Sequence, residues 1–314
     1  MTTRDDRIQG GLLGLLIGDA LGVPYEFHGP DQIPAQDQIE MAPPVGFHRA
    51  HSSVPTGTWS DDGAQALCLL ASLLERDGLE LADFGDRLVR WFDEGYLAVD
   101  GRVFDVGVQT QIALQKMSSG TTPELAGPND EYDNGNGSLM RVLPLALWHR
   151  GDDRELVRDA MRSSLPTHGH LRSQLCCAAY CLWARRMVGG AELRAAWNDA
   201  VDRIERLAGE FENGENELLV LDLRREPGGE GSGYVVDCIH SARLALEHDS
   251  FERVLKTAIA IGNDTDTTAA VAGGIAGIRF GATAIPTRWS RELRGRELLD
   301  PLLEALLARP AAHG

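Results

Sequence analysis

Apolar residues along this chain recur at three- and four-residue steps, and this helical period leaves almost no room for strands. The segments that carry the pattern are 7–22, 62–77, 81–94, 105–118, 137–150, 153–164, 169–187, 190–211, 233–248, 251–262, 266–280 and 288–308. Strand-like alternation is confined to Glu217–Leu223, where a helical turn fits equally well. Hydrophobic residues make up 43% of the 314 residues, as in ordinary globular proteins, and no loop has the length or bias of an interdomain linker. We therefore predict a single all-α domain that spans residues 1–314.

Two rows of glycine suggest how two of these helices pack. Gly10, Gly14, Gly18 and Gly22 form the first row, and Gly273, Gly277 and Gly281 form the second. A four-residue spacing puts each row on one helical face, where the missing side chains let another backbone approach. Both rows adjoin acidic residues, so we expect the first and the penultimate long helices to cross near a shared acidic site. Close packing alone would also explain the rows.

Charge and composition exclude several classes of function. The chain has 30 basic and 47 acidic residues, a formal net charge of −17 that repels nucleic-acid backbones and anionic membranes. The five cysteines include no CxxC pair, and we expect them to be buried in a reducing compartment. The first residues are acidic where a signal peptide would be basic, and no run of 18 apolar residues follows. We predict a soluble, cytoplasmic protein without a nucleic-acid or membrane partner.

Two short acidic clusters carry the clearest chemical signal. The first is Thr58-Trp59-Ser60-Asp61-Asp62 and the second is Gly262-Asn263-Asp264-Thr265-Asp266-Thr267-Thr268. Each precedes a helical segment, where Ser, Thr, Asp and Asn commonly serve as caps. Capping explains one acid at each helix start, but explains two neighbouring acids poorly.

A metal centre is the alternative explanation of these clusters. Four carboxylates with the hydroxyls of Ser60 and Thr267 form an all-oxygen set, which suits Mg²⁺, Mn²⁺ or Ca²⁺ rather than zinc or copper. Four carboxylates in one place would repel each other severely unless divalent cations neutralised them. Two divalent ions balance four carboxylates, so we expect a binuclear site in which one carboxylate bridges.

Across nearly the whole chain, the sequence resembles the ADP-ribosylglycohydrolase family, and in particular its dinitrogen-reductase type. The carrying segments, in chain order, are Gly18-Asp19-Ala20-Leu21-Gly22 with Glu26, Ser60-Asp61-Asp62, Asp105-Val106-Gly107, Asn136-Gly137-Ser138-Leu139-Met140-Arg141, Thr167-His168, Gly233-Tyr234-Val235-Val236 and Gly262-Asn263-Asp264-Thr265-Asp266-Thr267. Each is weak alone, but their joint occurrence in this order is highly specific.

The resemblance implies an orthogonal all-α fold and a two-metal Mg²⁺ or Mn²⁺ centre that holds the ribose of ADP-ribose. One ion would be surrounded by Ser60, Asp61, Asp62 and Asp266. The other would be surrounded by Asp264, Asp266 and Thr267, with Asp266 bridging. The implied reaction is hydrolysis of the bond between ribose C1″ and a modified side chain.

Two acids outside this set are candidates for acid–base catalysis. Cleavage at an anomeric carbon needs an activated water and help for the leaving group. The resemblance implicates Asp105 as base in relatives that act on arginine, and a glutamate near Glu26 in relatives that act on serine. We rank Asp105 first, although a surface acid or a helix cap explains either residue without the family.

The remaining matched residues are candidate ligand contacts, each with an ordinary alternative. Asn136, Gly137 and Ser138 belong to a glycine-rich turn before a helical segment, where backbone amides bind phosphate, although such a turn with a Ser cap is also common. The other candidates are Arg141, His168, Gly233 and Tyr234. Arg141 could equally pair with an acid, and Tyr234 could be a core residue rather than a face for adenine.

Substrate linkage stays open at this stage. Arginine-specific relatives carry Asn three residues after the acid that corresponds to Asp105, and this chain has Val108 there. We predict an enzyme acting on ADP-ribosylated arginine in proteins, with serine-linked or small-molecule ADP-ribose adducts as alternatives. A third possibility is an inactive structural protein on the same fold, but that would have lost metal ligands that are all present here.

Overall fold

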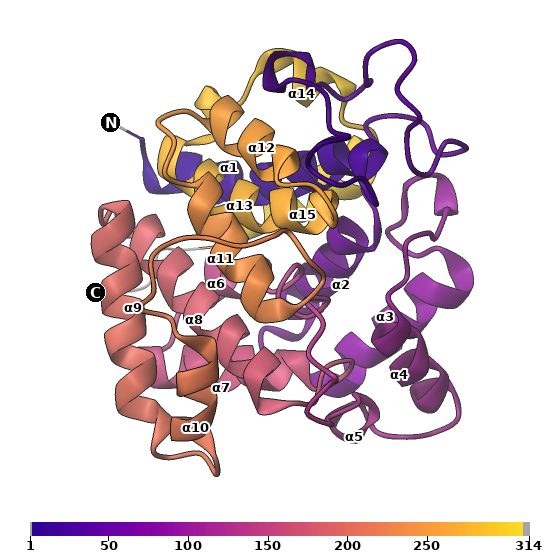
Figure 1. Cartoon of the computed structure of the whole chain (residues 1–314). Helices are drawn as coiled ribbons and strands as arrows, with labels where there is room; N and C mark the ends of the chain where they lie inside the picture. The colour runs from indigo at the N-terminus through magenta and orange to yellow at the C-terminus, as the bar shows by residue number, and fades with distance from the viewer. Residues whose placement is uncertain (1, 310–314) are drawn as a thin grey trace.

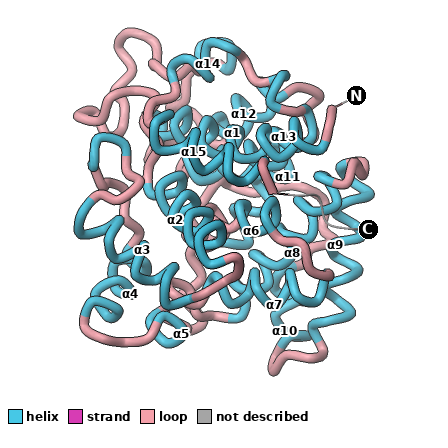
Figure 2. Tube along the Cα trace, turned by 180° about the vertical axis from the view of Figure 1, so that it is seen from behind, coloured by secondary structure: helices cyan, strands magenta, loops and turns pink. Residues whose placement is uncertain are grey.

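The described part of the chain is built from helices, as the helical period of the sequence predicts. In the computed structural model residues 2–309 are described, and they form fifteen α-helices and four short 3₁₀ turns without any strand (Figures 1 and 2). The helices are α1 (Arg4–Gly22), α2 (Asp61–Arg76), α3 (Leu81–Glu94), α4 (Val108–Ser118), α5 (Pro123–Ala126), α6 (Leu143–Trp148), α7 (Asp153–Ser164), α8 (Leu171–Val188), α9 (Leu193–Ala208), α10 (Gly214–Leu221), α11 (Val235–Ala245), α12 (Phe251–Ala260), α13 (Thr265–Phe280), α14 (Thr287–Glu292) and α15 (Arg296–Leu307). The 3₁₀ turns are Val23–Tyr25, Gln36–Gln38, Val99–Gly101 and Ala282–Ala284. The predicted all-α class is confirmed.

Three predicted helices have different limits, each for a local reason. The segment 137–150 is helical only from Leu143 to Trp148, because a series of turns precedes it and a proline in its first turn begins a new helix. The segment 288–308 is split into α14 and α15 at Gly295, whose φ of 72° interrupts the helix. The segment 105–118 begins at Val108, since Asp105 has a left-handed φ of 58°. The ambiguous segment 217–223 is mostly helical, in α10.

The two glycine rows bring α1 and α13 together, as predicted. A Cβ atom added to Gly10, Gly14 or Gly18 would collide with the backbone of α13. The same atom added to Gly273 or Gly277 would collide with the backbone of α1. The two helices lie side by side in the upper half of Figure 1. Glycine has a low helix propensity. In these two rows the close contact between the backbones, which no larger residue allows, offsets that cost.

Helix α1 is buried along most of its length. By length and composition Arg4–Tyr25 could cross a membrane, but 94% of its most apolar window lies inside the fold. Its side chains join one continuous apolar core with those of α8, which carries Cys176, Cys177 and Cys181. All five cysteines are free thiols and buried, as predicted. The apolar length of α1 is therefore used for core packing.

The glycine contact also fixes where the acidic clusters meet. At the end of α1 the carbonyl of Gly22 accepts a hydrogen bond of 2.8 Å from the Thr265 hydroxyl, in the first turn of α13. Nearby, Phe27 N–H donates to the Asn263 carbonyl at 2.8 Å. The segment after α1 is thus joined to the loop that precedes α13, and both lie beside the start of α2.

Candidate active site

Helix α2 begins against a buried carboxylate of α1. Asp19 accepts hydrogen bonds from the backbone N–H groups of Ser60, at 2.8 and 3.0 Å, and of Gly63, at 2.7 Å. Burial raises the pKa of Asp19 to about 7, although these hydrogen bonds oppose the rise. Asp19 therefore holds the first turn of α2, and with it the positions of Asp61 and Asp62.

Helix α13 supplies the opposing acids from its own first turn. Asp264 is the residue before the helix, and its carboxylate accepts a hydrogen bond of 2.8 Å from the Asn136 amide. Asp266 is completely buried in the first turn. The Thr267 hydroxyl donates to Asp62 at 3.4 Å, which joins the two helix starts directly. The structure thus brings both acidic clusters together, as the glycine rows predicted.

The carboxylates of this cluster have few hydrogen-bond donors. Among the described residues, one oxygen of Asp62 and both oxygens of Asp266 are buried without a hydrogen-bond partner. Burial, together with the negative charges of the neighbouring acids, raises the pKa values of Asp61, Asp62 and Asp266 well above the ordinary range. The pKa of Asp264 is also raised by burial, against the hydrogen bond from Asn136. Buried oxygens without donors are costly unless a cation binds them, so this set fits divalent metal ions.

A buried chain of side chains supports Asp61 from behind. The Gln65 amide donates to Asp61 at 3.0 Å, and Arg141 donates to the other end of Gln65 at 2.7 Å. Arg141 is 1% exposed and its guanidinium also lies over the ring of Phe84. The sequence predicts that Arg141 contacts the ligand. Its guanidinium, however, does not line the pocket that is described below. It orients Asp61 through Gln65 instead.

A pocket of about 290 Å³ opens beside the acids. Its lining comes from seven separate parts of the chain and includes Glu26, Asp61, Asp62, Asp105, Gly107, Val108, Gln109, Thr110, Gly135, Asn136, Gly137, Met140, His168, Gly233, Asp264 and Thr267. Ser60 and Asp266 are buried outside this lining. The pocket therefore has one acidic wall and one wall made of glycine-rich turns.

The glycine-rich wall contains four of the predicted ligand contacts. The backbone of Asn136 donates to the Gly233 carbonyl at 3.0 Å, so the two turns are held against each other. Gly137 lies against the ring of His168, where an added Cβ would collide with the imidazole. Burial lowers the pKa of His168 to about 3, so its ring is neutral at neutral pH. These residues offer backbone amides and a neutral imidazole to a ligand.

Two other predicted contacts lie away from the pocket lining. The Ser138 hydroxyl is buried and accepts a hydrogen bond of 2.8 Å from Ser164. Tyr234 is 38% exposed and accepts a hydrogen bond of 3.3 Å from Arg172. Ser138 thus supports the turn from inside, and Tyr234 is neither a core residue nor part of the lining. A contact between Tyr234 and adenine stays a prediction.

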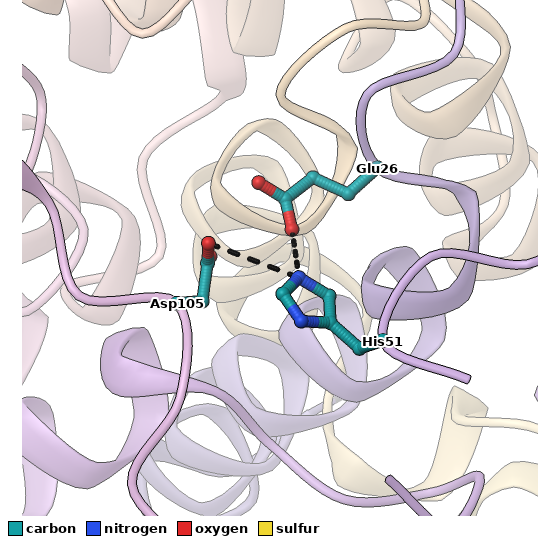
Figure 3. A group of neighbouring side chains, drawn as sticks. All are labelled: Glu26, His51 and Asp105. Atoms are coloured by element: carbon teal, nitrogen blue, oxygen red, sulfur yellow. Dashed lines mark hydrogen bonds and ion pairs between the residues drawn. The ribbon is translucent and has the colours of Figure 1, made fainter. Parts of the chain in front are cut away.

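Both candidate acid–base residues reach the pocket, and a histidine lies between them. His51 Nε2 is 2.7 Å from Glu26 Oε2 and 3.8 Å from Asp105 Oδ1 (Figure 3). Burial and the charges of Asp105 and Asp264 raise the pKa of Glu26 to about 11. Glu26 is also the more buried of the two acids, since its side chain is 5% exposed against 20% for Asp105.

Sequence reasoning missed three residues of this site. His51 belongs to a long loop, and no spacing or neighbouring pattern distinguishes it from the other histidines. Gln65 follows Asp61 by four residues on α2, a helical spacing that is a usable but weak signal. Asp19 was part of the matched segments, but its capping of another helix depends on a contact 41 residues away.

Comparisons with known proteins agree with this geometry. The family model described as ADP-ribosylglycohydrolase matches residues 1–314. The ADP-ribosylarginine hydrolase Tri1 of Pseudomonas putida (strain GB-1) is 30% identical over 308 residues, which cover 97% of this chain and 78% of the relative. The ADP-ribosyl-[dinitrogen reductase] glycohydrolase of Rhodospirillum rubrum is 30% identical over 296 residues, covering 92% and 90%.

A more distant relative and a solved structure are also similar to this chain. The human ADP-ribosylhydrolase ARH3 is 24% identical over 346 residues, which cover 96% of this chain and 92% of that protein. A solved structure, described as an ADP-ribosylglycohydrolase-related protein complex, superposes with a TM-score of 0.79 at 33% identity, covering 98% of this chain and 99% of the other. The chain therefore belongs to the ADP-ribosylglycohydrolase family, whose named members are hydrolytic enzymes.

Proposed function

We propose that this protein is a metal-dependent hydrolase that removes ADP-ribose from arginine side chains of proteins. The observation that carries the proposal is the meeting of two helix starts, where Asp62 and Asp266 present buried oxygens without donors. A structural protein on this fold would have no reason to keep such a costly arrangement. All six predicted metal-binding residues are present, which supports an active enzyme.

The two acidic clusters would share the metal ions. Ser60, Asp61, Asp62 and Asp266 would hold one ion, while Asp264, Asp266 and Thr267 would hold the other. Dependence on metal is a property of the family. When bound, Mg²⁺ or Mn²⁺ would neutralise these carboxylates and supply Lewis-acid polarisation of the ribose hydroxyls.

The chain's own residues provide the proton transfers. Asp105, the more accessible acid, takes a proton from water as the water oxygen forms a bond to C1″. The C1″–nitrogen bond breaks and its electron pair goes to the arginine nitrogen, which needs a proton. Glu26, whose pKa is raised chiefly by burial, is the candidate to supply this proton. The products are ADP-ribose and free arginine.

Two observations bear on the linkage. The two curated relatives at 30% identity are named for ADP-ribosylarginine and for dinitrogen reductase, which supports arginine as first choice. Val108 favours a second candidate, a serine-linked or small-molecule adduct hydrolase, because its apolar side chain is 73% exposed in the pocket lining where arginine-specific relatives have an amide. The amide would be the group that faces a leaving guanidine.

A side-by-side assay tests the proposal. Purified protein with Mg²⁺ or Mn²⁺ is incubated with arginine-, serine- and nucleobase-linked ADP-ribose, each with and without EDTA. We expect release of ADP-ribose from the arginine conjugate and no release in EDTA. A preference for the serine conjugate would select the second candidate, and Val108→Asn should then shift the preference toward arginine. Full activity after metal stripping would refute the metal-dependent mechanism.

A further inference from the structure

His51 lies between the two acids that compete for the catalytic role. Its Nε2 atom is within hydrogen-bond distance of Glu26, at 2.7 Å, and only within ion-pair distance of Asp105, at 3.8 Å (Figure 3). One nitrogen makes one strong hydrogen bond at a time, and the shorter distance goes to Glu26. The asymmetry therefore gives a structural difference between the two carboxyl groups, of which the sequence analysis ranks Asp105 first.

The ring of His51 is held in this position from several sides. It packs between Phe27 and Phe104, with ring centroids 5.6 and 5.1 Å away. Its backbone has a left-handed φ of 45°, which costs energy for a residue with a Cβ atom. Phe27 and Asp105 are also left-handed, with φ values of 62° and 58°. Such backbone strain is maintained only where the surrounding structure fixes it. Here the three strained residues lie around the hydrogen bond between His51 and Glu26.

The turn that carries His51 is fixed by backbone contacts. Val54 N–H donates to the His51 carbonyl at 2.8 Å, and Ala50 N–H donates to the Pro24 carbonyl at 3.0 Å. Two arginine side chains bind backbone carbonyls of the same turn. Arg49 binds that of Ser52 at 2.7 Å, and Arg102 binds that of Ser53 at 2.6 Å. The ionisable side chains paired with the His51 ring are Glu26 and Asp105.

We infer that His51 is a positioning residue for the proposed hydrolysis, a step that rests on the proposed function. Its hydrogen bond holds Glu26 at the acidic wall of the pocket, whereas Asp105 Oδ1, at 3.8 Å from Nε2, lies beyond hydrogen-bond distance of His51. Asp105 therefore lines the pocket without a restraint from His51, while Glu26 is held in place by it.

Two substitutions separate the hydrogen bond from the packing. His51→Phe keeps an aromatic ring between Phe27 and Phe104 but removes the ring nitrogen that bonds Glu26. His51→Gln gives up the ring but places an amide nitrogen near the position of Nε2. Both variants have a Cβ atom, so both bear the same backbone cost at this φ, and neither gains an advantage from relieved strain. His48→Phe and His48→Gln are matched controls, because His48 lies exposed on the same loop.

The expected result is a difference between these variants in kcat rather than in KM. Loss of the hydrogen bond that holds Glu26 should lower the kcat of His51→Phe about 10-fold, with KM little changed. His51→Gln should stay within about threefold of wild type, because its amide can again form a hydrogen bond with the Glu26 carboxyl group. Equal kcat in His51→Phe and wild type, or equal losses in both His51 variants, would overturn the inference.

Two further measurements distinguish a failure of this inference from a failure of the proposed function. In a double-mutant cycle, His51→Phe should add little to the loss in Glu26→Gln, but should add fully to that in Asp105→Asn. Without substrate, the ¹⁵N resonances of the His51 ring should move in Glu26→Ala and move less in Asp105→Ala. If wild type releases no ADP-ribose yet the resonances respond in this order, the contact stands and the proposed function fails. If the ¹⁵N resonances of the His51 ring do not move in Glu26→Ala, the inference itself is refuted.

Discussion

The carboxylate of Asp19 binds the backbone of Ser60 with both of its oxygens, at 2.8 and 3.0 Å. One buried acid of α1 thus binds the residue before α2, Ser60, which lies 41 residues later in the chain. The cap is not itself among the predicted metal ligands, yet it sets the direction in which Asp61 and Asp62 leave the start of α2. Its removal should therefore affect both stability and metal binding.

Asp19→Ala leaves the N–H groups of Ser60 and Gly63 without acceptors. Each unsatisfied buried group costs about 1–3 kcal/mol, so the free energy of unfolding should fall by at least about 2 kcal/mol in urea titrations. Mn²⁺ affinity, measured by calorimetry, should fall as well. Asp152→Ala is a matched control, because Asp152 caps α7 at the surface. It should cost about 0.5–2 kcal/mol without changing Mn²⁺ affinity. Unchanged affinity in Asp19→Ala would contradict the link between cap and site.

Stability without metal should depend on pH in an unusual direction. The folded-state pKa of Asp19 is about 7, far above that of an exposed carboxyl, and the pKa values of Asp61, Asp62 and Asp266 are also raised. Between about pH 4 and about pH 7 the folded protein therefore binds more protons than the unfolded chain, and its stability falls as pH rises.

Melting curves from about pH 5 to about pH 8 in EDTA test this sign. The Tm should decrease with pH in EDTA, whereas the stabilisation by Mg²⁺ should grow with pH, since the cation competes with protons for the carboxylates. A Tm in EDTA that rises with pH across this range would show that the acids are ionised at little cost.

The contact between α1 and α13 should not accept a single methyl group. In Gly14→Ala the new Cβ would collide with the backbone of Gly273, and overpacking of this kind costs about 1–3 kcal/mol. Gly228→Ala is the control, because nothing lies within 4 Å of the position of its added Cβ. Chemical denaturation should separate the two variants clearly. Equal midpoints would mean that the helices move apart at no cost.

Asp266→Asn should reduce metal binding more than any other single amide substitution. Both of its oxygens are buried without donors, and it would bridge the two ions. Calorimetric titration with Mn²⁺ should show weaker binding of both ions, and ADP-ribose affinity should fall together with turnover. The wild-type protein in EDTA should match the variant. Loss of only one ion would place the bridge at another carboxylate.

Asp105→Asn and Glu26→Gln should differ in their effect on chemistry. If Asp105 activates water, its amide should lower kcat by about 10²–10⁴-fold while ADP-ribose binding stays nearly intact. Glu26→Gln removes the proposed proton donor but should have the smaller effect, because a leaving guanidine is basic enough to take a proton from water. Single-turnover assays with parallel binding measurements separate rate from affinity. A larger rate loss in Glu26→Gln would reverse the assignment and favour a serine-type mechanism.

The sequence predicted the features of this site that depend on local spacing. The four acids at helix starts and the glycine rows follow rules that act over a few residues, and the structure brings them together as expected. The features it missed depend on distant contacts. The burial of Arg141 is decided by Gln65, 76 residues away, and His51 acquires its importance from Asp105 and Glu26.

The helix limits that the sequence predicts wrongly also have local causes. The period of apolar residues continues through 137–150, but Pro144 lies in the first turn of the helix that actually forms. Apolar periodicity records which residues face the core, and turns packed on the core can have the same pattern. The left-handed conformation of Asp105 is likewise invisible to periodicity, because neighbouring segments impose it.

The pairing of α1 with α13 also determines when the site can form during synthesis. The hydrogen bond between Gly22 and Thr265 closes a loop across 243 residues, so the acids of α2 wait for partners made much later. Until α13 leaves the ribosome, the glycine face of α1 has no backbone to cover it. A nascent chain that stops before α13 therefore exposes one of its most apolar helices and lacks half of its proposed metal ligands. Burial of the glycine face of α1 and completion of the proposed metal site thus both depend on α13.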